Sequence, residues 1–180
     1  VGRAIAERSP RQEIGYSFTI LDSEQINAFS LPGGYIFVTR GLLERAASDD
    51  ELAAVLAHEV GHVAERHAVK GFGVSLALGA LASEVSERES TLVQTVAATS
   101  AYLLVLHFSR TYENEADEFA LRYAYEAGYD PRGLLEFFKS LKSAYDKPSR
   151  LEELLQTHPP TPNRIGRAEA SAVLAPDNLE

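Results

Sequence analysis

The 180-residue sequence contains no cysteine, no methionine and no tryptophan. Without cysteine, the chain can form neither disulfides nor thiolate metal sites, so any metal site has to be built from histidine and carboxylate side chains. Basic residues are also too few for an electrostatic nucleic-acid binder, because 17 Lys and Arg stand against 26 Asp and Glu, a formal net charge of -9. We therefore expect no nucleic-acid partner.

Long uninterrupted apolar runs are missing too. The two uncharged stretches, about residues 72–82 and 91–106, are shorter than the roughly 20 residues that a spanning helix needs. We expect buried helices there, with peripheral contact to a membrane left open. The first eleven residues lack the pattern of a signal peptide, and a start at Val1 is consistent with an export signal that has been removed.

The pattern of apolar residues predicts a small N-terminal sheet followed by helices. Strand-like alternation covers residues 16–20, 28–31 and 35–39, with a Pro-Gly-Gly turn at 32–34. The chain has the size of one domain, so we predict a single domain over residues 1–180. Its sheet lies at about 14–40 and its helical part at about 41–180, which makes the predicted fold class α+β, mainly α.

Capping signals place the helices of the second part. Ser48 and Glu51 form a capping box, which predicts a helix from there to about residue 70. Further helices are predicted at about 109–126, ended by Gly128, and after residues 130–131, 149 and 161–162.

The segment from His58 to His62 reads His-Glu-Val-Gly-His, an H-E-x-x-H motif inside the first of these helices. Residues four apart share a helix face, so both imidazoles can reach one ion while Glu59 touches a water beside it. The plain alternative is a solvent-facing helix with two unrelated histidines. We interpret His58 and His62 as metal ligands and Glu59 as a catalytic base.

A catalytic zinc site usually has a third protein ligand. A third histidine six residues after His62 is excluded, because Ala68 stands there, and His67 points off the ligand face if the helix continues, as a surface or packing residue. The later helix offers Glu113 instead, and Asp117, one turn further, can hydrogen-bond a zinc-bound histidine. A merely exposed acidic helix is the alternative for this segment.

Several segments in this order resemble the gluzincin peptidase family that includes HtpX, the mitochondrial Oma peptidase, the type I CaaX prenyl protease and BepA. The matching pieces are residues 27–29, 31–42, 58–62, Ser109-Arg110 with Glu113 and Ala116-Asp117, 157–161, and Arg164-Ile165. They spread over most of the chain. The resemblance implies a gluzincin-like domain, with its sheet packed on a zinc-binding helix bundle.

Carried over by position, the resemblance implies one Zn²⁺ per chain, held by His58, His62 and Glu113, with catalysis by Glu59 and support from Asp117.

The resemblance also implies roles outside the zinc-binding helices. Gly33, Gly34 and Tyr35 would form an edge strand beside the cleft, where a peptide substrate could add as a further strand. His158 would lie near the metal, as an oxyanion stabiliser or a reversible plug, with a purely structural role as the alternative. Arg164 is a second candidate for the oxyanion or for a supporting position.

The function that follows is zinc-dependent endopeptidase action on protein or peptide substrates. The short apolar runs favour the soluble BepA-like branch, which implies extracytoplasmic quality control and a periplasmic or membrane-associated location, with the cytoplasm left open. Contact with a membrane or an outer-membrane assembly is conceivable, and nothing indicates an obligate oligomer. Two alternatives stay open: a zinc-dependent chaperone with a plugged site, and a helical scaffold with an accidental motif.

Overall fold

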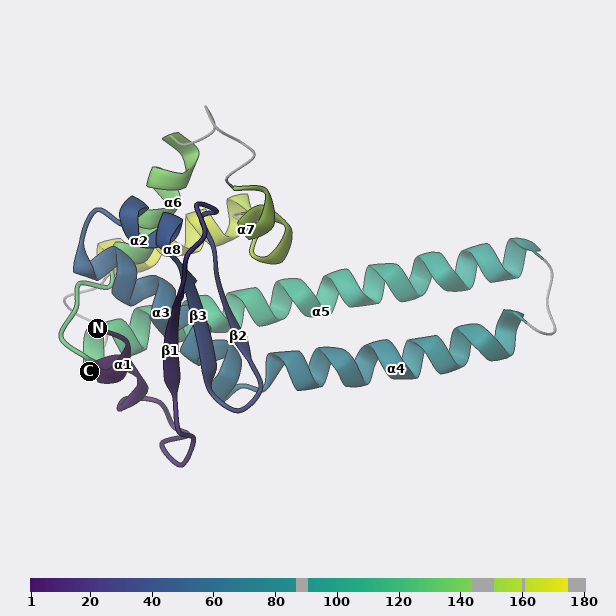
Figure 1. The fold of residues 1–180 in the computed structure, drawn as a ribbon. Coiled ribbons are helices and arrows are strands. Elements are labelled where there is room, and N and C mark those ends of the chain that lie inside the picture. Colours follow the sequence, from purple (N-terminus) through teal and green to yellow (C-terminus); the bar gives the residue numbers. More distant parts are fainter. Residues whose placement is uncertain (87–90, 144–150, 160, 175–180) are drawn as a thin grey trace.

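The computed structural model of the protein describes residues 1–86, 91–143, 151–159 and 161–174. Side chains are described within these ranges except at residues 78–108, 142–143, 152–153 and 172–174. The elements are α1 (Gly2–Ala6), β1 (Ser17–Leu21), β2 (Ala28–Leu31), β3 (Tyr35–Thr39), α2 (Arg40–Arg45), α3 (Asp49–Ala64), α4 (His67–Ser86), α5 (Thr91–Glu126), α6 (Gly133–Ser143), α7 (Glu152–Thr157) and α8 (Pro162–Leu174) (Figure 1). The predicted fold class, mainly helical with a small sheet, is confirmed.

The sheet has the order β1-β3-β2, with β1 parallel and β2 antiparallel to β3. The predicted turn connects β2 to β3. Gly33 and Gly34 adopt φ values of 97° and 93° there, which residues other than glycine rarely adopt. Ile36 and Val38 of the central strand are buried and join the core that includes α3.

Helix α3 begins where the capping box predicts. The Ser48 side chain accepts a hydrogen bond from the Glu51 N–H, and the Glu51 carboxylate accepts one from the Ala47 N–H. Most of the helix is buried, because it contacts β2 on one side and α5, α6 and α1 on others. It is therefore the central element of the fold.

Helix α3 ends earlier than predicted, at Ala64 rather than near residue 70. Arg66 follows in the left-handed region, with φ 59°, and a separate helix starts at His67. No glycine or proline marks this break, so the sequence pattern did not reveal it.

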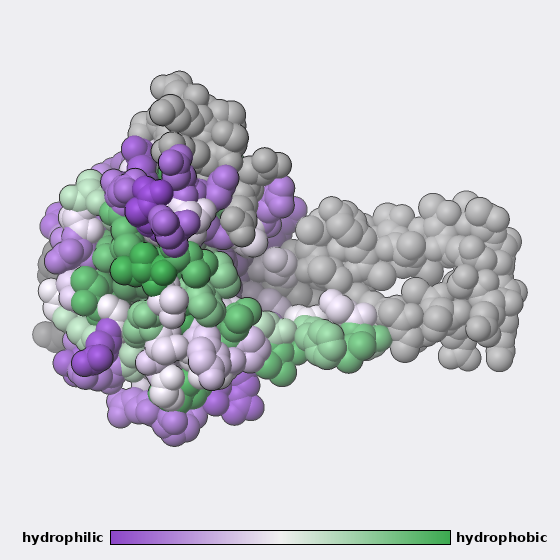
Figure 2. Space-filling view, in the orientation of Figure 1, coloured by the Kyte–Doolittle hydropathy of each residue, from purple (hydrophilic) through white to green (hydrophobic). Residues whose placement is uncertain are grey.

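The two apolar stretches belong to long helices that run side by side away from the body, as Figure 1 shows for α4 and α5. The prediction of buried helices is wrong for the described start of α4, where Val69, Phe72 and Leu76 are 53%, 65% and 59% exposed. Figure 2 shows this apolar surface beside the body. None of the described helices is long and apolar enough to cross a membrane.

The remaining helix ends follow the predicted signals, but the start of α5 does not. The helix predicted at 109–126 is not separate: it is the second half of α5, which runs unbroken from Thr91 and ends, as predicted, before Gly128 (φ 88°). Helix α6 starts at Gly133, two residues after Pro131, and α8 starts at Pro162, where Thr161 accepts a hydrogen bond from the backbone. Residue 149, the predicted cap of α7, lies outside the described residues.

Small residues allow α3 and α5 to approach closely. Ala116 and Ala120 on α5 are fully buried, and a Cβ added to Gly61 on α3 would lie 2.8 Å from the Cβ of Phe119. Such a distance is too short for two carbon atoms, so the helices would have to move apart.

We expect Gly61→Ala to lower the free energy of unfolding by about 1–3 kcal/mol, because the added methyl group overpacks the contact with Phe119. Gly71→Ala is the matched control: Gly71 also lies inside a helix, but nothing approaches its Cβ position within 4 Å. That variant should gain up to about 1 kcal/mol from helix propensity. Urea unfolding with a chelator present measures both, and equal gains would contradict the close approach.

Candidate metal centre

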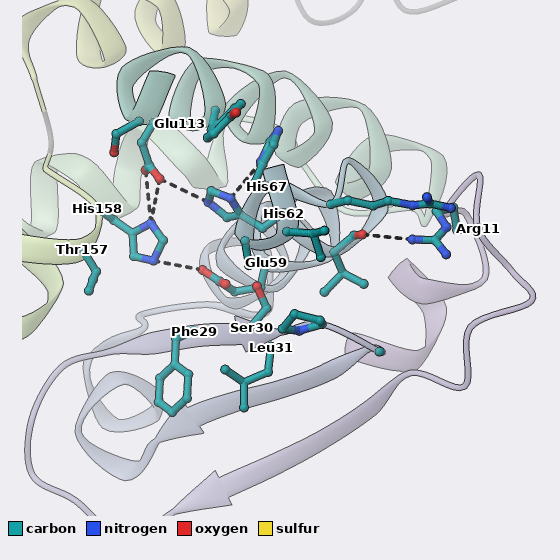
Figure 3. A pocket seen from close by; sticks show the side chains of 18 residues that line it. Arg11, Phe29, Ser30, Leu31, Glu59, His62, His67, Glu113, Thr157 and His158 are labelled. Atoms are coloured by element: carbon teal, nitrogen blue, oxygen red, sulfur yellow. Dashed lines mark hydrogen bonds and ion pairs between the residues drawn. The ribbon is translucent and has the colours of Figure 1, made fainter. Parts of the chain in front are cut away.

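Helix α3 presents His58 and His62 on one face, as their spacing predicts. Their Nε2 atoms lie 3.0 Å apart, and their rings meet edge to face. His58 is 5% exposed and the His62 side chain 13%, so both are largely shielded from water. Neighbouring Glu59 is 2% exposed, and together with His62 it lines a cleft in the surface (Figure 3). The motif therefore places two ring nitrogens and a carboxylate in one buried position.

Helix α5 brings Glu113 to these rings. Its Oε1 atom lies 3.2 Å from Nε2 of His62, and its Oε2 atom lies 3.4 Å from Nε2 of His58. The carboxylate comes from a residue more than fifty positions after the motif, so only the packing of α5 on α3 produces this convergence.

The three ligand atoms fit a tetrahedral metal ion. With metal–ligand bonds of about 2.0–2.1 Å, tetrahedral geometry separates neighbouring ligand atoms by about 3.3 Å. The two Nε2 atoms lie 3.0 Å apart, and each lies near a different oxygen of Glu113: His62 is 3.2 Å from Oε1 and His58 is 3.4 Å from Oε2. Histidine nitrogen and carboxylate oxygen are also donors that zinc accepts. The residues present therefore fit a bound metal.

Asp117 and Arg164 form a buried pair behind the ligands. Asp117 Oδ1 lies 3.0 Å from Nδ1 of His58, at ion-pair distance although without the alignment of a hydrogen bond. The Arg164 guanidinium donates to both Asp117 oxygens at 2.7 Å, contacts Glu113 at 2.7 Å and donates to the Pro159 carbonyl. These contacts occupy most of its donors, so we interpret Arg164 as support for the carboxylates rather than as an oxyanion donor.

The charges in this cluster shift its protonation equilibria strongly. Burial lowers the pKa of His58, but Asp117 and Glu113 outweigh it and raise that pKa to about 10. Burial raises the pKa of Glu113, but hydrogen bonds from His158, His58 and His62 reverse this and hold it far below its usual range. Asp117 behaves in the same way, with Arg164 as the strongest opposing partner. The two carboxylates are therefore ionised and attract cations.

Glu59 is placed to accept a proton. Burial raises the pKa of its carboxyl, but His158, His62 and His58 outweigh burial and lower it below the usual value. Its Oε2 atom is buried and accepts no hydrogen bond of ordinary length from the described residues. An ionised carboxylate with unused acceptor capacity is what a general base requires.

His158 closes the cluster from the loop between α7 and α8. Its Nδ1 atom lies 3.1 Å from both Glu113 oxygens and 3.4 Å from Nε2 of His58, while its Nε2 atom lies 3.5 Å from Glu59. The Nδ1 distances match those among the three ligand atoms. His158 thus lies where a fourth ligand would be.

A cleft of about 500 Å³ leads to this cluster, with Glu59, His62, Glu113 and His158 in its wall (Figure 3). Strand β2 forms another side through residues 29–31, followed by Pro32 and Gly33. The edge strand at Tyr35 that the resemblance implied is wrong, because β3 is the central strand and β2, like β1, lies at an edge. Of the three residues expected beside the cleft, Gly33 lines it, whereas Gly34 and Tyr35 do not.

His67 was missed as a member of the site. It is 4% exposed rather than on the surface, and its Nδ1 atom lies 2.9 Å from Nδ1 of His62. Its Nε2 atom lies 3.0 Å from Oε2 of Glu115, and Tyr112 stacks on its ring at 4.5 Å. The five-residue spacing between His62 and His67 excluded this contact only on the assumption that the helix of the motif continues to residue 67. The left-handed backbone of Arg66 ends that helix, and nothing in the sequence indicated it.

The charged residues further along α5 form ion pairs at the surface. Arg122 pairs with Glu126, and Glu118 pairs with Arg167 of α8. All four side chains are exposed, so these pairs contribute little to stability.

Comparison with known proteins finds one matching family model and several relatives. The family model described as Peptidase family M48 matches residues 1–172. The chain is 36% identical over 158 residues to the mitochondrial metalloendopeptidase OMA1 of Arabidopsis thaliana, covering 87% of this chain and 32% of the relative. It is 25% identical over 184 residues to the beta-barrel assembly-enhancing protease of Escherichia coli, covering 96% and 37%.

A third relative is the mitochondrial metalloendopeptidase OMA1 of Schizosaccharomyces pombe, 29% identical over 161 residues that cover 89% of this chain and 48% of the relative. The chain thus spans about a third to a half of the length of these relatives.

We expect a divalent metal such as zinc to stabilise the folded chain, because its ligands converge only when α5 packs on α3. Binding at a thousand times the dissociation constant would add about 4 kcal/mol to the free energy of unfolding. Thermal unfolding with zinc and with EDTA measures the difference as a shift in Tm. Glu113→Gln should lose most of the shift, and an unaltered chain with the same Tm in both conditions would contradict the metal site.

Proposed function

The chain belongs to peptidase family M48, and from this premise we propose that it is a zinc-dependent endopeptidase that hydrolyses peptide bonds of protein substrates. The observation that carries the proposal is the convergence of His58, His62 and Glu113 at tetrahedral spacing beside the buried base Glu59. A site that served structure alone would need no base at its edge.

The proposed reaction divides the chemistry between the metal and the chain. When bound, a zinc ion polarises a peptide carbonyl and makes an attacking water more acidic. Glu59 takes the proton of that water and delivers it to the leaving amine, since its carboxylate is ionised and its Oε2 atom is free to accept. Asp117 holds the ring of His58 from behind, and Arg164 keeps Asp117 ionised and contacts Glu113.

We infer that a substrate binds as an added strand along β2. This strand lies at an edge of the sheet, and of the two edge strands it is the one whose residues 29–31 line the cleft beside Glu59. Figure 3 shows Ser30 directly beside Glu59, and this position supports the proposal because an added strand along β2 would run next to the base. Strand addition recognises main-chain groups, so it suits varied protein substrates.

A role in extracytoplasmic protein quality control is part of the proposal. Its support is the similarity to relatives described as beta-barrel assembly-enhancing proteases. Under this proposal the chain acts in the periplasm or at an extracytoplasmic membrane surface, where contact with an outer-membrane assembly would bring it to its substrates.

A second candidate is a chaperone-like binder whose site is plugged by His158. The observation that favours it is the position of His158 Nδ1, which has the spacing of a fourth ligand to His58 and Glu113. A catalytic zinc site keeps that position open for water. We propose that His158 moves away from the position of the fourth ligand during turnover. The endopeptidase and the chaperone-like binder would then differ in how often His158 leaves this position.

We expect Glu59→Gln to lower casein cleavage by about 100- to 10,000-fold, because it removes the general base. The variant should bind zinc in the same molar ratio as the unaltered chain, since Glu59 is not one of the three proposed ligands. Metal analysis and casein cleavage measure the two properties. Full cleavage by the variant would reject the proposed base, and no cleavage by either protein would favour the chaperone-like binder.

We expect His158→Ala to raise casein cleavage at saturating zinc, because it frees the position where water must bind. If His158 instead stabilised the oxyanion, the same variant would lose about 100- to 1000-fold in kcat. Thr157→Ala is the control, since Thr157 lines the cleft beside His158 but directs its hydroxyl at the Leu154 carbonyl. A loss for His158→Ala with an unchanged control would overturn the plug.

A further inference from the structure

Each proposed metal ligand needs a partner for the atom that faces away from the metal. His58 has Asp117 and Glu113 has Arg164. For His62, the partner of Nδ1 is the Nδ1 atom of His67, at 2.9 Å. Metal-binding histidines usually direct this atom at a carboxylate, a carbonyl or water, so a second imidazole in that place is unusual.

Glu115 fixes which nitrogen of His67 carries the proton. Its ionised carboxylate is an acceptor only, so Nε2 of His67, 3.0 Å away, has to be the donor. A neutral imidazole has one donor and one acceptor, which leaves Nδ1 of His67 as the acceptor. With a metal bound between Nε2 of His62 and the Glu113 carboxylate, 3.2 Å apart, Nε2 has to offer its lone pair to the ion, and Nδ1 of His62 then donates to His67.

The surrounding structure holds this chain of contacts in place. Arg66 adopts a left-handed conformation, which ends α3 and places His67 beside His62. Tyr112 of α5 stacks on the His67 ring with an interplanar angle of 17°, which fixes the plane of the ring. His67 is 4% exposed, whereas the Glu115 side chain is 41% exposed. The contacts therefore run from the buried site to the surface.

We propose that His67 and Glu115 are positioning residues for the metal: through the hydrogen bonds Glu115–His67–His62 they hold His62 in the tautomer whose Nε2 lone pair faces the ion. This proposal rests on the proposed metal site. Neither residue is a proposed metal ligand, although His67 also lines the cleft. Their effect is on the orientation and basicity of His62, and so on metal affinity.

The test is the zinc dissociation constant, measured by competition with a chelating dye. His67→Phe keeps a flat ring against Tyr112 but removes both hydrogen bonds, and it should weaken zinc binding about 10- to 100-fold. His67→Gln restores an acceptor and a donor and should recover part of the loss. Glu115→Gln should weaken binding less than His67→Phe, and as an exposed residue it leaves folding intact.

Glu118→Gln is the matched control, because Glu118 is an exposed acid on the same helix that pairs with Arg167, away from the site. Its zinc affinity should equal that of the unaltered chain. The visible spectrum of the cobalt-substituted protein gives an independent readout, and we expect it to change in His67→Phe but not in the control. A loss of stability that leaves the folded site unaltered would not move that spectrum.

Unchanged zinc affinity in both His67→Phe and Glu115→Gln would overturn the positioning role while leaving the metal site in place. Equal losses in Glu115→Gln and Glu118→Gln would overturn it too, because they would report surface charge. If the unaltered chain bound two zinc ions and His67→Phe bound one, His67 would be a ligand of a second cation site with Glu65 and Glu115, and the positioning role would be wrong. An unaltered chain that binds no zinc would reject the metal site and the positioning role together.

Discussion

Helices α3 and α5 approach each other where Gly61 meets the side chain of Phe119, and this contact sets the distance between the two imidazoles and the carboxylate of Glu113. Fully buried alanines on α5 keep the helices close on both sides of the same contact. A separation larger by the width of one methyl group would carry Glu113 beyond the range of a shared ion. The chemistry of the site therefore depends on the absence of side-chain volume at one position of the motif.

The site also concentrates negative charge below the surface. Glu59, Glu113 and Asp117 are each at most 6% exposed, and buried charges are costly unless they are paired. Arg164 compensates one of these charges, which leaves two that a divalent cation would balance. The same excess of negative charge raises the pKa of His58 to about 10, because the carboxylates that would attract a metal ion also stabilise the protonated ring.

The sequence was sufficient for the local features and insufficient for those that depend on packing. Four-residue spacing put His58 and His62 on one face and Glu113 with Asp117 on another, because helix geometry alone determines such faces. Alternation predicted three strands but not that β3 lies between β1 and β2, since it does not specify which strands pair. Apolar composition likewise suggested buried helices for a segment of α4 whose described apolar side chains are exposed.

The contact between His67 and His62 shows why the residues that orient metal ligands are harder to predict from sequence than the ligands themselves. A ligand pair lies within one helix, whereas the groups behind His58, Glu113 and His62 come from α5, α8 and α4. Each of these contacts requires a helix to end, cross or turn at a particular residue. For His62 that residue is Arg66, whose left-handed backbone occurs without the glycine that usually marks it. An orienting group can therefore lie five residues from its ligand and still escape any rule based on helical spacing.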